Sequence, residues 1–400
     1  MVRINSNLRL FLFVIILLNV NQVLAFEISG YAGVESLGFI NNPLDSQQHN
    51  HYLSVAIEPE FYHEWDEGKQ SLLFVPFYRL SQHDDKRTHF DIRELTWLKV
   101  ANDWELRVGV RKEFWGVAEA KHLVDIINQT DVVENFDRED KLGQPMINLA
   151  LINDWGTLDL FLLTGFRDRT FPGQEGRLRA FPEVDVGEER YEKHGFEKNM
   201  AYAIRWSHAI GDWDIGLSHF YGTSRDPTFL IEADGAGNTR LIPYYEMIHQ
   251  TGIDVQLTDE SWLWKLESIV RSGQGNTYFA GIAGFEYTFF NLFESALDLG
   301  LLAEYLYDSR GSHSQVALQD DFLVAFRFGF NDVQSTEILA GIIFDRTNNA
   351  KFYNIEASRR LGDRWRVELE ARLFSSAPKS DPAYFLRKDD HLRVELKYFF

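Results

Sequence analysis

Arginines and acidic residues of opposite charge are concentrated in one part of the chain, between residues 93 and 131. Three arginines lie in two segments where apolar and charged residues alternate, and four acids follow; the set is Arg93, Arg107, Arg111, Glu113, Glu119, Asp125 and Asp131. A guanidinium is always charged and forks onto carboxylates. Opposed charges across a narrow passage create a transverse field that orients and sieves polar solutes. We predict that these side chains line a constriction.

Enzymatic chemistry is disfavoured by what the rest of the sequence offers. The chain has 12 histidines, but no spacing between serine, histidine and aspartate stands out from chance. His49 and His51 together form an incomplete metal site, because a metal ion needs more ligands than two exposed imidazoles. Glycine-rich phosphate loops and basic patches are absent from the sequence, and its net charge of −20 disfavours nucleic acid as a partner. We therefore predict no enzyme, no metal and no cofactor.

The elements that position these charges are β-strands, because apolar and polar residues alternate with a period of two along most of the chain. In the last segment, Leu392, Val394, Leu396, Tyr398 and Phe400 alternate with Arg393, Glu395 and Lys397. Eighteen strands are predicted (sixteen is the near alternative), over residues 26–39, 51–65, 70–82, 89–101, 103–115, 143–153, 156–169, 197–210, 212–224, 244–258, 261–272, 276–290, 295–309, 319–331, 336–347, 351–361, 364–375 and 390–400.

Short and long connections between the predicted strands alternate along the chain. Every second connection is short and carries turn residues, as at 66–68, 102–103 and 362–363. Most of the others are longer and more polar, notably 116–142, 170–196, 225–243 and 376–389. This asymmetry predicts an antiparallel up-and-down barrel that spans an outer membrane, with short periplasmic turns and long extracellular loops. A closed barrel also leaves no free strand edge, which an amphipathic terminal strand would otherwise expose.

Aromatic and charged residues agree with this orientation. Six tryptophans lie next to short turns and predict an aromatic girdle at the periplasmic interface: Trp65, Trp104, Trp155, Trp213, Trp262 and Trp365. In the strand predicted at 319–331, Phe322, Phe326 and their alternate neighbours are expected to face lipid, while Asp321 and Arg327 face inward. Glu94 and Arg359 break the alternation, and we expect them near a rim or a bulge.

The 116–142 segment is the most distinctive connection. Residues 118–128 look helix-like, and Val117, Leu123, Ile126 and Ile127 are apolar. Apolar residues on the extracellular side should be buried, and the interior of the barrel is the available place. We predict that this segment folds into the lumen and forms a constriction; the alternative is a loop that caps the rim from above.

The N-terminus has the pattern of a secretory signal peptide. Basic residues precede a short apolar run, and small residues follow before Phe26, so residues 1–25 are predicted to be removed and 26–400 to form the barrel. Nine apolar residues are too few to span a bilayer as a helix, and the mean hydropathy of −0.27 excludes a helical membrane protein. Without cysteine, the chain has neither a disulfide framework nor a lipoprotein attachment site.

Two motifs carry a resemblance. The final strand resembles the C-terminal strand of Gram-negative outer-membrane barrels, which end in phenylalanine as an assembly signal; Tyr398 and Phe400 would play that part here. The run from Arg107 through Trp115-Gly116 to Asp125-Ile126-Ile127-Asn128 resembles a motif of porin-like proteins of uncharacterised substrate, although Gln129 stands where proline is usual. The resemblance implies a bacterial outer-membrane location, the barrel assembly machinery, membrane lipid and lipopolysaccharide as partners, and a homotrimer as an open expectation.

Taken together, the sequence predicts a passive, porin-like channel for small polar solutes. Two other classes stay open. Apolar residues on predicted inward faces, among them Phe161, Leu163, Leu302, Leu323, Leu339 and Ile343, would suit a carrier or exporter of apolar compounds. A structural or adhesion barrel with an occluded lumen would instead use its long loops to bind a partner.

Overall fold

The computed structural model describes residues 26–400 except 234–236 and 315–316, so the predicted signal peptide lies outside the described residues. Eighteen long strands form one sheet. They are β1 (Glu27–Phe39), β2 (His51–Trp65), β3 (Gln70–Ser81), β4 (His89–Val100), β5 (Trp104–Arg111), β6 (Gln144–Asn153), β7 (Gly156–Leu163), β9 (Ala201–Ile210), β10 (Trp213–Thr223), β13 (Met247–Asp259), β14 (Trp262–Gly273), β15 (Gly275–Phe289), β16 (Asp298–Asp308), β17 (Asp320–Gly329), β18 (Glu337–Asp345), β19 (Lys351–Leu361), β20 (Trp365–Ser375) and β21 (His391–Phe399).

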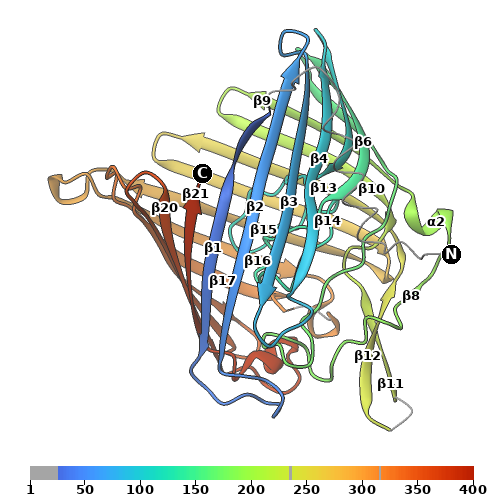
Figure 1. The fold of residues 1–400 in the computed structure, drawn as a ribbon, viewed down its shortest axis with the longest axis vertical. Coiled ribbons are helices and arrows are strands. Elements are labelled where there is room, and N and C mark those ends of the chain that lie inside the picture. The colour runs from blue at the N-terminus through green and yellow to red at the C-terminus, as the bar shows by residue number, and fades with distance from the viewer. Residues whose placement is uncertain (1–25, 234–236, 315–316) are drawn as a thin grey trace, which may run out of the picture.

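The sheet is closed into a barrel (Figure 1). Each of these strands pairs antiparallel with the next one along the chain, and β21 pairs antiparallel with β1 from Tyr31 opposite Phe399 to Phe39 opposite His391. The backbone N–H of Phe400 adds a bond of 3.1 Å to the carbonyl of Gly30. The predicted antiparallel barrel of eighteen strands is therefore confirmed, and the final strand closes it as expected.

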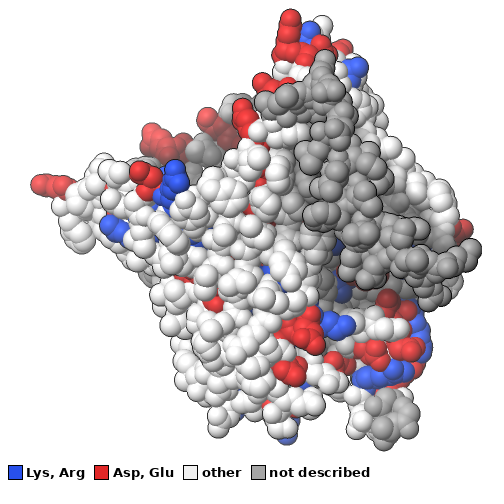
Figure 2. All heavy atoms as spheres, viewed as in Figure 1, with Lys and Arg blue, Asp and Glu red and all other residues white. Residues whose placement is uncertain are grey.

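Alternation along the strands separates an apolar outer face from an inner face that carries the charged residues together with some apolar ones. On β17, Phe322 and Phe326 are exposed on the outside, whereas Asp321 and Leu323 are buried toward the lumen. Trp365, Leu369 and Leu373 of β20 are exposed as well. Figure 2 shows a broad uncharged area on the side of the barrel where β1 and β2 lie in front, with charged side chains gathered mainly toward its ends. The inward assignment of the charges on these strands is confirmed.

The two ends of the barrel differ in connection length. At the short-turn end, β4 and β5 are joined through 101–103, and Gly211 and Gly362 adopt the positive φ that tight turns require. At the long-loop end lie the connections 112–143, 164–200, 224–246 and 376–390. Some connections depart from the rule: Gln274 alone joins β14 to β15 and residues 346–350 join β18 to β19 at the long-loop end, whereas 290–297 and 330–336 are longer connections at the other.

Two predicted loops contain strands that the sequence pattern did not reveal. β11 (Thr228–Ala233) and β12 (Thr239–Tyr245) form a hairpin, and β8 (Arg190–Tyr191) pairs parallel with β12. This small sheet projects at the long-loop end (Figure 1). The prediction of plain loops at 170–196 and 225–243 was wrong, because these short strands pair outside the barrel and add no period-two face to its wall.

Helical structure is confined to short pieces among the described residues: α2 (Phe196–Asn199) and the 3-10 turns η2 (Leu292–Glu294), η3 (Gly311–His313) and η4 (Pro382–Leu386). None of the helices that the structure describes is long and apolar enough to cross a membrane. Several strands are shorter than predicted; for example, β5 and β7 end at Arg111 and Leu163, and β9 starts at Ala201.

The tryptophans predicted to form a girdle lie at strand ends or in short turns. Trp65 ends β2, Trp104 starts β5, and Trp262 and Trp365 start β14 and β20. The two residues that broke the alternation also have a structural explanation. Glu94 adjoins a bulge where β3 and β4 change register, and Arg359 lies near the end of β19, where it pairs with Asp332 at 3.3 Å.

Candidate functional site

The 116–142 segment is held by carboxylates of the barrel wall. Glu267 of β14 accepts bonds from the N–H groups of Val117 and Ala118 through one oxygen (2.7 and 2.8 Å). Its other oxygen accepts from the N–H groups of Leu123 and Val124 (2.6 and 3.2 Å). These wall contacts come from a strand about 145 residues further along the chain.

A second wall carboxylate repeats this arrangement. Glu304 of β16 accepts from the N–H groups of Glu119 (2.7 Å) and Ala120 (2.8 Å). Both Glu267 and Glu304 are almost fully buried. Residues 118–128, all of them described, contain no helix, so the prediction of helix-like structure there was wrong. A charged acceptor binds an amide more strongly than a backbone carbonyl does, and consecutive N–H groups aimed at one carboxylate cannot also form i→i−4 bonds.

The apolar side of the segment packs on one wall of the barrel. Leu123, Val124, Ile126 and Ile127 are buried. They join a cluster with inward-facing residues of β6 to β16: Met146, Phe161, Leu163, Ala201, Ala203, Phe220, Ile248, Ile269, Tyr278, Ala280, Ile282 and Leu306. Val117 is only partly buried. The segment therefore contacts inner faces of strands that run from β6, which is paired to β5, around the barrel to β16.

The later part of the segment is fixed by ion pairs to the opposite wall. Glu134 pairs with Arg79 of β3 at 2.9 Å, and Arg79 and Arg87 both pair with Glu35 of β1. All four side chains are buried. Buried charges at this depth are tolerable only when they are paired and hydrogen-bonded, and removing one partner is strongly destabilising. This network connects the segment to β1, to β3 and to the connection between β3 and β4.

A further link runs from the segment to β20. The amide of Asn135 donates to Glu370 at 3.1 Å, and Arg372 donates to Asp137 at 2.9 Å. Arg372 also pairs with Glu370 at 3.1 Å. The segment thus contacts side chains of β14, β16, β3 and β20, and it crosses the barrel interior between them.

The seven predicted constriction residues do not form one ring. Arg93 pairs with Asp131 at 2.6 Å, and both are buried. On and just after β5, Arg107 pairs with Glu105 and Arg111 pairs with Glu113. Glu119 lies across the barrel, where it pairs with Arg327 at 2.8 Å, and Asp125 accepts bonds from the N–H groups of Trp115 and Gly116.

A cavity of about 540 Å³ lies between the 116–142 segment and the wall formed by β17 to β20. Of the predicted seven, Glu119 and Asp125 line it, and the other five do not. Its lining includes apolar side chains of β17 to β20, namely Leu323, Leu339, Ile343, Phe352 and Phe374. It also includes charged side chains, of the segment and of the wall: Lys121, His122, Asp137, Arg138, Glu139, Arg271, Arg310, Glu356 and Arg372.

Two titratable groups of the segment depart from their ordinary pKa values. Burial lowers the pKa of His122, but the carboxylates of Glu139, 3.2 Å from Nε2, and of Glu267, 3.7 Å from Nδ1, outweigh burial and raise it to about 10. Burial, together with the nearby carboxylates of Glu134 and Asp137, raises the pKa of Asp140 to about 7. His122 is therefore a cation at neutral pH, while Asp140 changes its charge at a pH close to neutral.

Three clusters in the described residues bring together groups able to bind metal. Two lie among arginines: His89, Asp131 and Glu134 adjoin Arg79 and Arg93, and Asp137, Glu356 and Glu370 adjoin Arg372. In both, a guanidinium already neutralises the carboxylates. The third, His49, His83 and Glu175, lies at the long-loop end. His51, the residue weighed with His49 from the sequence, instead lies 3.0 Å from Ser36 Oγ.

Sequence reasoning missed the residues that hold the segment. Neither Glu267 nor Glu304 is among the predicted constriction residues. Glu134 and Asp137 were also missed, whereas the sequence predicts Leu323, Leu339 and Ile343 of the cavity wall as inward-facing apolar residues. Alternation marks Glu267 and Glu304 as inward-facing, and that is the only sequence signal for them. Which backbone amides they meet depends on the closure of the barrel.

Comparison with known proteins adds little beyond the general architecture. No protein-family model matches the chain, and no curated protein matches it. Among solved structures, a mutant of the Rh. blastica porin aligns over 94% of this chain and 100% of its own, at 10% identity and a TM-score of 0.46. OmpT of Vibrio cholerae, described as an outer membrane protein and carrying a deletion of loop L8, aligns over 94% and 99%, at 8% identity and a TM-score of 0.48.

Proposed function

We propose that the chain is a bacterial outer-membrane channel of the porin type, through which small polar solutes diffuse passively. The observation that carries this proposal is the closed barrel with an apolar outer face and a charged interior, which suits a lipid environment outside and water inside. The short-turn end would face the periplasm and the long-loop end the exterior. The six tryptophans would then form the periplasmic girdle, and Phe400 would belong to the assembly signal.

The 116–142 segment would set the width of the passage. Its apolar side is fixed on the β6–β16 wall, so the space left for a solute is the cavity beside β17–β20. A solute would pass between the charged side chains of the segment and the inner face of these strands. Arg93 and Asp131 would act as an anchor of the segment, since they pair with each other and are buried.

Single-channel recording in planar bilayers tests this route. Ile343 faces the cavity from β18, whereas its neighbour Ile342 lies on the outer face opposite Val324. Ile343→Trp should lower the conductance because the indole fills part of the passage. The matched control, Ile342→Trp, adds the same ring to the lipid side and should leave conductance unchanged. Equal conductance in both variants and the parent protein would place the passage elsewhere.

A second recording tests the arginines predicted from the sequence. Changing Arg107 and Arg111 to glutamate should shift ion selectivity toward cations if solutes pass β5. Unchanged selectivity, together with an effect of Ile343→Trp, would restrict the passage to the β17–β20 side. Absence of ohmic steps in the parent protein would contradict the channel proposal altogether.

A carrier for apolar compounds is the second candidate, and the apolar wall of the cavity favours it. Leu323, Leu339, Ile343, Phe352 and Phe374 line a space that charged side chains line as well. Such a surface suits a molecule with an apolar body and a polar end. A barrel without conductance that retains a lipid-like molecule after purification would support the carrier. A barrel with neither property would fit the structural or adhesion class.

A further inference from the structure

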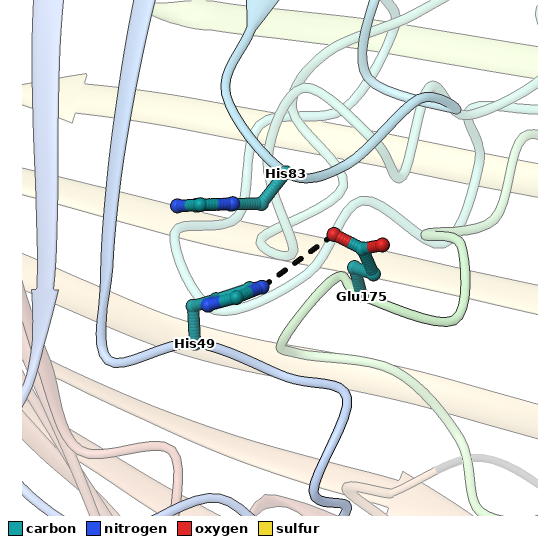
Figure 3. A group of neighbouring side chains, drawn as sticks. All are labelled: His49, His83 and Glu175. Carbon is teal, nitrogen blue, oxygen red and sulfur yellow. Dashed lines mark ion pairs between the residues drawn. The ribbon is translucent and has the colours of Figure 1, made fainter.

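His49, His83 and Glu175 come together at the long-loop end from three separate connections (Figure 3). His49 lies between β1 and β2, His83 between β3 and β4, and Glu175 between β7 and β8. One potential ligand atom from each lies within 4.8 Å of the other two. Glu175 Oε2 is 3.5 Å from His49 Nε2, and the two imidazoles are stacked with their centroids 3.7 Å apart.

We propose that this cluster binds one divalent transition-metal ion, with Zn²⁺ as the ion of choice. Two imidazoles and one carboxylate form a donor set that zinc accepts, leaving a fourth position open to water. Ligand atoms about 2.0–2.1 Å from a tetrahedral ion lie about 3.3 Å apart, close to the distance between His49 and Glu175. The imidazole of His83 has to turn out of the stack so that its nitrogen points to the same centre.

The three connections are held in place next to the cluster before any ion arrives. The hydroxyl of buried Tyr52 accepts from the N–H of His49 (3.0 Å) and donates to the carbonyl of Glu175 (2.5 Å). Asp84, beside His83, accepts from the N–H of Gly173 at 3.1 Å. Ligands that are positioned in advance lose less entropy when they bind an ion.

The backbone of His83 is a second, independent observation. Its φ of 70° lies in the left-handed region, which a residue with a Cβ adopts at a cost. Glycine or asparagine would fit that turn more easily. A histidine at such a position places an imidazole against His49 and Tyr52, to both of which its ring is close.

The charge around this cluster also differs from that of the two lumen clusters. Among the residues that the structure describes, the ion pair of Glu175 is with His49 rather than with an arginine or a lysine. The side chains of His49 and Glu175 are 41% and 52% exposed, so an ion can reach them from solvent. A bound ion would link three connections at the same mouth of the barrel and restrict their movement.

Isothermal titration of the purified mature protein in detergent with Zn²⁺ at pH 7 tests the proposal. The parent protein should bind about one ion with saturation. His49→Ala and His83→Asn should each weaken binding at least tenfold; asparagine is chosen at 83 because it tolerates the left-handed backbone. The control His51→Ala removes a nearby histidine outside the cluster and should bind as the parent does.

Co²⁺ and Ca²⁺ give a second measurement. Co²⁺ at a site with two imidazoles should give visible absorption bands that Zn²⁺ displaces and that the double variant His49→Ala, His83→Asn lacks. Ca²⁺ should not displace Co²⁺, because calcium prefers a larger shell of oxygen ligands. Saturable binding of equal strength in the double variant, or its absence in the parent protein, would overturn the proposal.

Discussion

Glu267→Gln is the most direct test of how the 116–142 segment is held. The carboxylate accepts four backbone N–H groups, two on each oxygen. A glutamine side chain keeps its shape but offers one oxygen and one NH₂ group. Two of the four amides would then face a donor instead of an acceptor, and the other two would lose the charge of their partner.

The size of the effect follows from the bonds that are lost. A hydrogen bond to a charged group contributes about 1.5–3 kcal/mol, so the loss of two amounts to roughly 3–6 kcal/mol. One factor of ten in an equilibrium corresponds to about 1.4 kcal/mol. Local opening of residues 117–124 should therefore become about two to four orders of magnitude more frequent.

Hydrogen–deuterium exchange of the folded protein measures that opening directly. Exchange at the N–H groups of Val117, Ala118, Leu123 and Val124 should accelerate in Glu267→Gln, while the strands keep their protection. Larger fluctuations of single-channel current should accompany the change, because the segment borders the cavity. Wild-type exchange at these four amides in a folded variant would refute the view that the carboxylate is the anchor.

Two matched variants show whether the effect is specific. Glu304→Gln loses one of its two bonds, to Glu119 or Ala120, so about half the free-energy change is expected there. Glu368→Gln removes an inward charge that pairs with Arg366 and Lys397 on the wall. It should leave exchange in the segment unchanged. Equal acceleration in Glu368→Gln would mean that any lost wall charge loosens the barrel.

Two further predictions concern charge. The pKa of His122 rises from 6.5 to about 10 on folding, so its contribution to stability is complete below pH 6.5 and is lost as the pH rises toward 10. The protection of the segment's amides, measured as their exchange rate relative to the unfolded chain at the same pH, should fall over that range, and His122→Gln should remove this fall. On β19, Ile355 faces outward and Asn354 inward. Ile355→Arg should cost about 2–4 kcal/mol in urea unfolding from lipid vesicles, and Asn354→Arg, beside Glu356, clearly less; equal costs would contradict a lipid-facing exterior.

The strands and their faces could be predicted from the sequence because both depend on neighbouring residues. A period of two places Phe322 and Asp321 on opposite faces wherever the strand lies. Turn residues such as Gly211 and Gly362 mark their own positions, since their backbone preference is local. Closure also followed, because an amphipathic terminal strand such as 390–400 needs a partner on its free edge.

The internal structure of the 116–142 segment could not be predicted in the same way. Its residues have a helix-like pattern, but six of its N–H groups are bound by Glu267 and Glu304, which are distant in the sequence. The partners of Arg93 and of His49 likewise come from other connections. Register around the closed barrel determines which of these side chains meet, and register is a property of all eighteen strands together.

The sequence by itself determined that the chain forms an antiparallel barrel with an apolar exterior and a charged interior. Neighbouring residues of a strand point to opposite faces, so the order of apolar and polar residues along the chain is enough to define both faces. Only the tertiary structure decided where the segment is anchored, that the cavity lies beside β17–β20, and that His49 meets His83 and Glu175 rather than His51. Those contacts join residues far apart in the chain, and no local preference specifies them.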